Sequence, residues 1–509
     1  MSSNERLPVA PVHSGRNSVG TPVSSPILSR TVQPTLHIQR ISPQVRITPQ
    51  ARCYAISELA RRAEIPAEFQ KQWTIRVEAG ETIVTLDPRG EKTIVFPHAG
   101  PDLLRELSAG QIRTVRRRWM FLPKNAATLN IPDFVVPFAR DVDALPRSLF
   151  VVRGAGRIEC TVDLPLSILM TLTRWEETLN RELDSHGRFP ALHSVASRDG
   201  FLDRPIVDEY GLAFQQAVQV CYPAWQPPQK SLRIKISHDA DHVGIPFRWK
   251  EAVRHTTHFR RPLDSARDLF GLLTGSEPSD LRALREIVRL SLGRNLDSAV
   301  YWKASQPSLQ DSGYDPRHRK IRDVIAWLIE NQVECGVHPG YETFRAPEKL
   351  RREIQVLREA MGAGPLGGRQ HYLRWCPDTW IHWETCGLAY DSSVCFADRI
   401  GFRAGTCIPY RPWLFPLNRS AELLEIPLLV MDRTLLGYMK LSQEESIVAV
   451  RDCLARCRAV GGVFTLVWHN NNLLDPKYKS LYLKLLPLFV DGERYDWARD
   501  YRSNSEKQL

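Results

Sequence analysis

The sequence predicts an α/β protein whose larger, C-terminal part is built on a parallel sheet, either a barrel or a doubly wound sheet. Strand-like and helix-like segments alternate from about residue 231 onward. One of them, residues 462–468, is almost continuously apolar, as expected of a parallel strand that is covered on both faces. Ionisable side chains directly follow several of the strands, where parallel folds of both kinds gather their sites. These three observations agree on one fold class.

The length of the chain predicts two domains plus tails, because 509 residues exceed the usual size of a single hydrophobic core. Residues 1–52 are rich in Ser and Pro and contain six Arg and one Glu, which is typical of a disordered basic arm. The arm thus carries +5 of the net charge of +11 and leaves +6 for the remaining residues. Since this part is only mildly basic and has no concentrated basic face, we expect no nucleic-acid partner.

Residues 53–228 predict a smaller mixed α/β domain between the arm and the parallel sheet. Residues 81–86 and 92–96 have the pattern of two strands around a Pro-Gly turn, and residues 164–183 have the pattern of a helix. A linker that contains Pro223, Pro227 and Pro228 is predicted to close the domain.

Residues 229–495 predict the parallel-sheet domain, with a helical insertion at about 243–300. Ser442 and Glu445 form a capping box at the start of a helix that runs to Gly461. The other expected elements are a strand at 232–236, a helix from Asp315-Pro316, a strand at 333–337, a helix from Pro347 to Gly362, and the strand at 462–468.

Several classes of protein are excluded by what the sequence lacks. No stretch approaches the roughly 18 consecutive apolar residues of a membrane span, and the N-terminus lacks the apolar core of a secretory signal. The ten cysteines include no C-x-x-C pair, which excludes zinc ribbons and thioredoxin-like motifs. We therefore expect a cytoplasmic protein with reduced thiols and no membrane span.

The densest group of ionisable residues is Ser237–His242, at the end of the strand 232–236. Asp239 and Asp241 are two positions apart, so in a regular strand both face the same side. Two carboxylates in a small space repel each other; a divalent cation relieves this and leaves one carboxylate as a base. The plainer alternative is a structural Asp pair that caps the following turn.

Two histidines at the ends of other strands are predicted to join these carboxylates. His338 follows the strand 333–337, and a neutral imidazole there is a natural ligand for zinc. Glu342 adds a third ligand if the segment turns helically. His469 ends the strand 462–468, where it can protonate a leaving group. The alternative for both histidines is a hydrogen-bonded residue at a strand end.

A third polar segment, residues 368–375, is crowded with donors and aromatic faces. Arg369 and Arg374 can fix carboxylates, either catalytic or carried by the substrate. Because the pattern is strand-like, we expect only one of the two to be functional. Tyr341 is a further candidate for substrate binding.

With these residues in hand, 231–470 resembles the NodB-type polysaccharide deacetylases. Asp239 and Asp241 match the base and the metal-binding Asp of that family's first motif, in the variant where one residue separates them. His338 matches the first His of the second motif, and His469 matches the general-acid His after the last strand. The region Arg369–Arg374 corresponds loosely to the Arg-containing motif, whereas Glu342 stands where the family has a second His.

The resemblance implies an incomplete (β/α) barrel, a bound metal and N- or O-deacetylation, and it is greatest to a bacterial subgroup with an additional N-terminal domain. The resulting hypothesis is a metal-dependent hydrolase that removes acetyl groups from a polysaccharide or glycan intermediate, in bacterial surface or exopolysaccharide metabolism. Contact with the polysaccharide assembly machinery is a further expectation. The predicted site comprises Asp239 and His469 as catalytic residues, Asp241, His338 and Glu342 as ligands of a divalent metal with zinc favoured, and Arg369, Arg374 and Tyr341 as substrate-binding residues.

Two alternatives remain open from the sequence. The departure at Glu342 is compatible with a catalytically weakened carbohydrate-binding or assembly protein. A metallohydrolase that acts on another non-peptide C–N bond is the second alternative.

Overall fold

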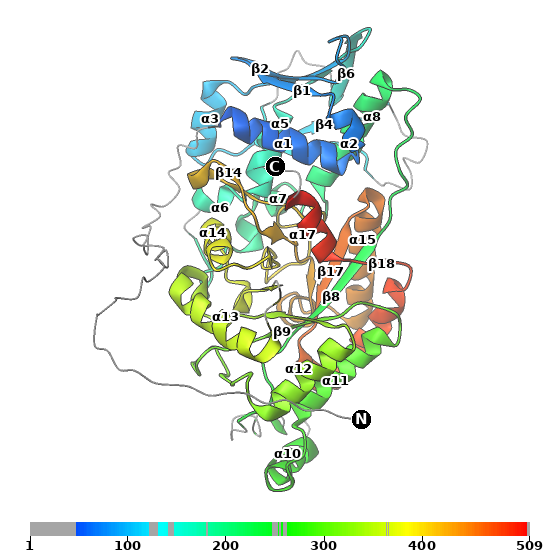
Figure 1. Cartoon of the computed structure of the whole chain (residues 1–509). Helices are drawn as coiled ribbons and strands as arrows, with labels where there is room; N and C mark the ends of the chain where they lie inside the picture. The colour runs from blue at the N-terminus through cyan, green and yellow to red at the C-terminus, as the bar shows by residue number, and fades with distance from the viewer. Residues whose placement is uncertain are drawn as a thin grey trace, which may run out of the picture. The chain divides into compact units, whose positions relative to one another are not determined.

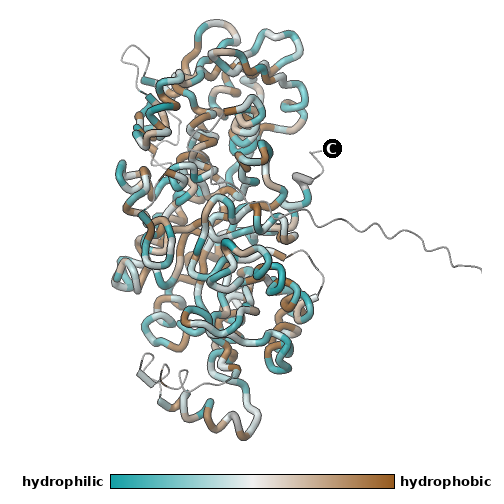
Figure 2. The backbone as a smooth tube through the Cα atoms, turned by 90° about the vertical axis from the view of Figure 1, so that its left-hand side faces the viewer, coloured by the Kyte–Doolittle hydropathy of each residue, from teal (hydrophilic) through white to brown (hydrophobic). Residues whose placement is uncertain are grey.

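The computed structural model contains two main sheets, and it describes residues 47–121, 131–140, 147–179, 182–246, 253, 256–257, 262–362, 364 and 366–505. Figure 1 labels several strands of both sheets, together with most of the helices. In the tube of Figure 2, hydrophobic segments run through the middle, and hydrophilic segments occupy many outer loops. No helix within the described ranges is long and apolar enough to cross a membrane.

The smaller sheet is mixed, with the strand order β1-β2-β3-β7-β6. All its pairs are antiparallel except β3 with β7. The two strands expected at 81–86 and 92–96 are present as β2 and β3. The bounds are β1 Thr74–Val77, β2 Glu81–Thr85, β3 Thr93–Pro97, β6 Phe150–Gly154 and β7 Arg157–Cys160. A two-stranded pair, β4 Thr114–Arg117 with β5 Phe134–Pro137, lies outside this sheet.

Helix α1 (Pro49–Arg62) begins inside the last part of the segment predicted as the arm. Thr48 caps this helix, because its hydroxyl accepts from the backbone N–H of Ala51 at 3.2 Å, and Pro49 is preorganised for the first turn. The rest of the arm, residues 1–46, lies outside the described residues. The other helices before the large sheet are α2 Ala67–Gln70, α3 Pro101–Ser108, α5 Leu164–Leu172, α6 Glu176–Leu179, α7 Val195–Arg198 and α8 Ile206–Cys221.

The single helix expected at 164–183 is wrong, because α5 ends at Leu172 and α6 starts only at Glu176. Between them Arg174 adopts a φ of +54°, which is outside the helical region. Its guanidinium binds Glu176 and, at 2.8 Å, Glu177. This buried ion-pair cluster therefore competes with a continuous helix.

The larger sheet is a curled parallel sheet with the strand order β15-β12-β11-β10-β9-β8-β17-β16, and β18 pairs with β8. Every pair in it is parallel. In the described residues its two end strands, β15 and β16, do not pair with each other, so the sheet forms an open barrel. The bounds are β8 Arg233–Asp239, β9 Ala299–Trp302, β10 Glu334–Val337, β11 Gly367–Gly368, β12 Tyr390–Asp391, β15 Leu424–Glu425, β16 Val430–Met431, β17 Val463–Val467 and β18 Glu493–Arg494.

Helices connect these strands, as the alternating pattern of the sequence predicts. The capping box of Ser442 and Glu445 starts α15 (Gln443–Val460), and Gly461 ends it with a φ of +69°. The helix expected from Asp315-Pro316 starts later, at Arg319, because His318 provides the cap for Lys320. The bounds of the remaining helices are α10 Pro262–Thr274, α11 Ser279–Leu292, α12 Arg319–Glu330, α13 Pro347–Met361, α14 Pro377–Thr385, α16 Pro476–Leu485 and α17 Trp497–Ser505.

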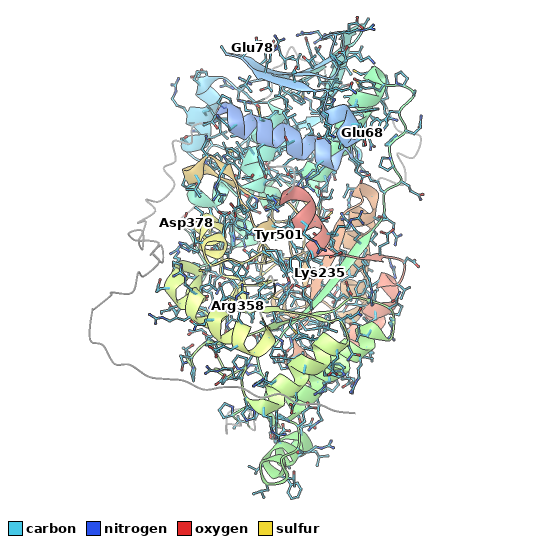
Figure 3. All side chains as sticks on the ribbon, in the orientation of Figure 1. Glu68, Glu78, Lys235, Arg358, Asp378 and Tyr501 are labelled. Carbon is cyan, nitrogen blue, oxygen red and sulfur yellow. The ribbon has the colours of Figure 1, made fainter. Side chains whose placement is uncertain are left out.

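The inside of the open barrel contains ion pairs as well as apolar side chains. Lys235 on β8, labelled in Figure 3, is buried and forms an ion pair with Glu334 on β10. Asp391 and Glu425 lie opposite each other on β12 and β15, and both are fully buried. Burial raises the pKa of Asp391 to about 7, and burial followed by repulsion from Asp391 raises the pKa of Glu425 well above its usual range.

These two acids predict how stability depends on pH. The folded chain keeps protons that the unfolded chain releases near about pH 4, so the free energy of unfolding falls as the pH rises from there through about 7. We expect Glu425→Gln to flatten the melting temperature between about pH 5 and pH 8 and to raise it at the upper end. Thermal unfolding followed by fluorescence measures this effect. Glu422→Gln, on the exposed neighbouring residue, is the control, and an equal response of both variants would contradict the expectation.

Candidate metal centre

Polar side chains from six strand ends meet at the carboxyl edge of the open barrel. They line a cavity of about 260 Å³ whose walls include Asp239, Asp241, His338, His371 and His469. This is the edge at which parallel α/β sheets assemble their sites, because the loops after the strands converge there.

Asp239 and Asp241 enter the cavity from β8 and the residues that follow it. The strand is longer than expected and continues to Asp239, because Ser237, His238 and Asp239 pair with β9. His238 therefore points away from the cavity: it is fully buried, and its Nδ1 lies 3.0 Å from the Trp468 carbonyl. Successive side chains of a strand point to opposite sides, so His238 and the Asp239 that follows it face away from each other.

Three donor atoms form a compact group: a carboxylate oxygen of Asp241 and one ring nitrogen each of His338 and His371. The Asp241 Oδ1 lies 3.2 Å from His338 Nε2 and 3.3 Å from His371 Nε2. Bonds of about 2.0–2.2 Å at tetrahedral angles separate two zinc ligands by about 3.4 Å, so this spacing fits a common cation.

Hydrogen bonds on the far side of each imidazole orient these nitrogens. The His338 Nδ1 donates to the Arg369 carbonyl at 2.7 Å, and the His371 Nδ1 lies 2.7 Å from Asp311 Oδ1. A donor on Nδ1 leaves the lone pair of Nε2 for the cavity, which is the usual arrangement of metal-binding histidines.

The fit to a cation also follows from polar atoms that the described residues leave unsatisfied. His338 Nε2 and Asp241 Oδ1 are buried and have no hydrogen-bond partner of good geometry among the described residues. Burial lowers the pKa of His338, an effect that the charges of Asp239 and Asp241 oppose, so the ring favours its neutral form. A ring nitrogen and a carboxylate oxygen at 3.2 Å repel each other unless a proton or a metal cation lies between them, so this pair fits a cation site.

Glu342, predicted as the third ligand, does not lie in this group, and His371 occupies that place. The Glu342 side chain is 64 % exposed, and its carboxylate is 3.9 Å from Arg374. The expected helical turn does not form, since the Gly340 N–H donates to Glu353 at 2.8 Å and the Tyr341 N–H donates to Asp311 at 3.0 Å. These contacts direct residue 342 toward solvent.

His371 reaches the cavity from a short turn after β11. Gly368, the last residue of that strand, lies so close to β10 that a Cβ on it would be 1.8 Å from the Val337 carbonyl oxygen. The turn itself contains two consecutive non-glycine residues in the left-handed region, Tyr372 at φ +60° and Leu373 at φ +55°. Such conformations cost about 1–3 kcal/mol each and persist where the surroundings hold them. The strand-like pattern expected at 368–375 is thus wrong beyond residue 368.

Arg369 lies beneath Asp239 and holds it. Its Nη1 donates to Asp239 Oδ1 at 2.8 Å, and its Nη2 donates to the Ser237 hydroxyl at 3.0 Å. Burial raises the pKa of Asp239, but the charge of Arg369 outweighs this and keeps the pKa below its usual value. Of the two alternatives expected for Arg369, the structure shows a contact with a carboxylate of the chain itself, Asp239. The other carboxylate oxygen, Oδ2, lies 3.8 Å from His338 Nε2.

His469 follows β17, the strand next to β8, and its Nε2 lies 3.7 Å from Asp241 Oδ2. Its Nδ1 lies 2.7 Å from Asp432 Oδ1, and Asp432 also accepts from the Asn472 amide at 2.9 Å. Burial lowers the pKa of His469, but Asp432 outweighs this and raises it to about 9. The ring is therefore held in one orientation with a proton available on Nε2.

The other two predicted substrate-binding residues lie beside the cavity. Arg374 donates to the Tyr341 carbonyl at 2.6 Å, and its guanidinium lies over the Tyr341 ring at 3.8 Å. The Tyr341 hydroxyl is 3.3 Å from His186 Nδ1. These contacts bind the two residues to each other and to the loop at 184–189.

Four polar residues of the site were not predicted: Lys303, Asp311, His371 and Asp432. Lys303 and Asp432 each follow a short apolar strand, β9 and β16, so the strand-end pattern could have indicated both. Lys303 Nζ lies 2.9 Å from Asp311 Oδ1, while Asp311 belongs to a loop without a comparable pattern. Burial raises the pKa of Asp311, but the His371 hydrogen bond and the Lys303 charge outweigh it and hold the pKa well below its usual range.

The fold and site together define an open parallel barrel with an Asp-His-His group, an adjacent carboxylate and a facing histidine. Residues 47–223 match the model of a family of unknown function, DUF7033. No curated protein matches the chain. Among solved structures, the chain is similar to a protein assigned as a polysaccharide deacetylase from Mycobacterium smegmatis, with 15 % identity over 56 % of this chain and 94 % of that one and a TM-score of 0.38.

Two further structures give similar values. PuuE allantoinase has 12 % identity over 54 % of this chain and 93 % of that one, with a TM-score of 0.37. A protein assigned as a polysaccharide deacetylase from Pseudomonas aeruginosa PAO1 has 14 % identity over 54 % and 94 %, with a TM-score of 0.36. Because these scores are low, the function proposed below rests on the geometry of the site.

Proposed function

We propose that this chain is a metal-dependent hydrolase that removes acetyl groups from a glycan. The observation that carries the proposal is the position of the Asp239 carboxylate between the Asp241-His338-His371 group and the buried Arg369. A base next to three ligand atoms, together with a histidine that follows the neighbouring strand β17, is a set of groups that can hydrolyse an amide or an ester.

A divalent cation held by Asp241, His338 and His371 would supply Lewis-acid chemistry, polarising the acyl carbonyl and lowering the pKa of water. Zinc is favoured because two imidazoles and one carboxylate with an open fourth position are a typical catalytic zinc set.

The residues of the chain divide the proton transfers between them. Asp239 takes a proton from the attacking water, and Arg369 keeps the carboxylate ionised and oriented for this step. His469 donates its Nε2 proton to the departing amine or alkoxide, while Asp432 holds the ring through Nδ1. The two groups enter the cavity from the neighbouring strands β8 and β17, and each carries out one of the two proton transfers of the hydrolysis.

The walls of the cavity support a sugar as the carrier of the acetyl group. Tyr372 and Tyr438 line it with aromatic rings and hydroxyl groups, and Asn471 and Asn472 add amides. A sugar ring has apolar C–H faces and polar edges, so it needs this combination of surfaces.

The position of His371 supports an active hydrolase over a weakened binding protein. The latter alternative was based on Glu342 as a departure from a complete ligand set, whereas His371 offers a third donor atom. The alternative of another C–N bond is an outcome of the test below.

Removal of metal is expected to abolish acetate release. After treatment with a strong chelator and dialysis, the protein should release no acetate from chitooligosaccharides or O-acetylated oligosaccharides, and added Zn²⁺ should restore the activity. Acetate is measured enzymatically across the panel, with a cyclic amide as a further substrate. Activity that survives the chelator, or cleavage of the cyclic amide without acetate release from any sugar, would contradict the proposal.

A further inference from the structure

The loop at residues 184–189 reaches the turn that carries His371, although it belongs to the part of the chain that precedes the barrel. Arg188 makes the connection: its Nη1 donates to the Tyr372 carbonyl at 3.0 Å and its Nη2 to the Tyr438 hydroxyl at 3.2 Å. Its Nε donates to Asp184 at 2.7 Å. The guanidinium is buried and is thus fixed at three points.

The loop is rigid enough to serve as a support. The Asp184 Oδ1 accepts from the backbone N–H groups of His186 and Arg188, both at 2.9 Å. Gly187 closes the turn at a φ of +71°, the left-handed region in which glycine has no steric cost. Asp184 therefore fixes both the backbone of the loop and the side chain of Arg188.

A second contact leads to the segment after the ligand His338. The His186 Nδ1 lies 3.3 Å from the Tyr341 hydroxyl, and the His186 ring centroid is 4.6 Å from that of Tyr372. The loop consequently touches both segments that follow the histidine ligands.

The turn that receives these contacts is the strained one. Tyr372 and Leu373 both have positive φ values directly after His371. Within the barrel, the turn is held by the Leu373 N–H to the Gln370 carbonyl at 3.0 Å and the His371 N–H to the Pro339 carbonyl at 3.2 Å. Neither bond reaches the Tyr372 carbonyl, which Arg188 alone binds in the described residues.

We propose that Arg188 is a positioning residue of the metal centre: it holds the turn 371–373 so that the His371 Nε2 faces Asp241 and His338. The inference rests on the proposed function and extends it, because it assigns the DUF7033-matching segment a part in the site. The barrel edge is then complete only with the preceding part of the chain.

Cobalt binding to the full chain tests this inference, because Co²⁺ reports the geometry of its ligands in its visible absorption. The metal-free protein is titrated with Co²⁺ alone, comparing wild type with Arg188→Ala, Arg188→Lys and the control Arg153→Ala, whose guanidinium is in a surface ion pair with Glu159. We expect Arg188→Ala to bind Co²⁺ about tenfold more weakly with a shifted spectrum, since supporting groups of metal ligands typically contribute 10–100-fold. Arg188→Lys should recover part of the loss, and the control should match wild type.

Hydrogen exchange of the metal-free protein gives a second, independent readout. Faster exchange in Arg188→Ala confined to peptides covering residues 369–376 supports the proposal, and should Arg188→Ala not fold, Arg188→Lys provides the comparison. If a folded variant shows wild-type Co²⁺ affinity, spectrum and exchange, Arg188 does not position the turn. If wild type binds no Co²⁺, the proposed function fails, and the exchange data still decide whether Arg188 holds the turn.

Discussion

Replacing His371 with alanine is expected to abolish stoichiometric zinc binding, whereas replacing Glu342 with alanine leaves it intact. His371 Nε2 lies 3.3 Å from the Asp241 carboxylate, while Glu342 points to solvent. Removing a ligand should weaken affinity by more than about 100-fold, since the loss of a supporting hydrogen bond already costs 10–100-fold. Titration calorimetry and elemental analysis of the dialysed proteins measure the difference.

The two variants distinguish the ligand set seen in the structure, which includes His371, from the ligand set predicted from the sequence, which includes Glu342. Both residues follow strands of the same sheet, and Glu342→Ala serves as the matched control because its exposed side chain contributes little to folding. The opposite result, with zinc lost in Glu342→Ala and kept in His371→Ala, would restore the ligand set expected from the sequence and overturn the metal centre described above.

Replacing Asp239 with asparagine is expected to abolish acetate release and to leave the metal content unchanged. An amide cannot take a proton from water, and the loss of a general base typically lowers kcat by about 10²–10⁴-fold. The Asn carbonyl oxygen can still accept the Arg369 hydrogen bond now made by Oδ1, so the fold should persist. Acetate release and zinc content are measured on the same preparation.

Asp203→Asn is the control for this experiment, because Asp203 is an exposed carboxylate, 3.4 Å from Arg456 at the surface. It should retain wild-type activity. Full activity of Asp239→Asn would remove this carboxylate from the mechanism, and joint loss of zinc and activity would indicate that Asp239 is a ligand.

Several elements of the larger sheet and its helices follow from local sequence patterns. The apolar run 462–468 became β17 in the middle of the parallel sheet, and the capping box of Ser442 and Glu445 starts α15 as predicted. Such patterns lie within short segments, so they can be recognised without knowing which other segments pack against them. The single helix expected at 164–183 does not form, because a buried ion-pair cluster around Arg174 interrupts it. Such contacts leave no periodic pattern of apolar residues in the sequence.

Part of the site was accessible in the same way. Asp239, Asp241, His338 and His469 follow strands, and parallel strands bring their carboxyl ends to one edge whatever their separation along the chain. In the structure, Asp241 Oδ1 lies 3.2 Å from His338 Nε2. Their chemical functions stay predictions until the variants above are measured.

The sequence by itself determined the parallel α/β class and the strand ends at which ionisable groups collect. The spacing of apolar residues, the helix caps and the residues at strand ends are all properties of short segments. Only the tertiary structure brings His371, and not Glu342, next to Asp241 and His338, and only it brings Arg188 to the same turn. Those pairings depend on a left-handed turn and on a loop from the preceding part of the chain. Their geometry arises from packing between segments far apart in sequence, which no local pattern encodes.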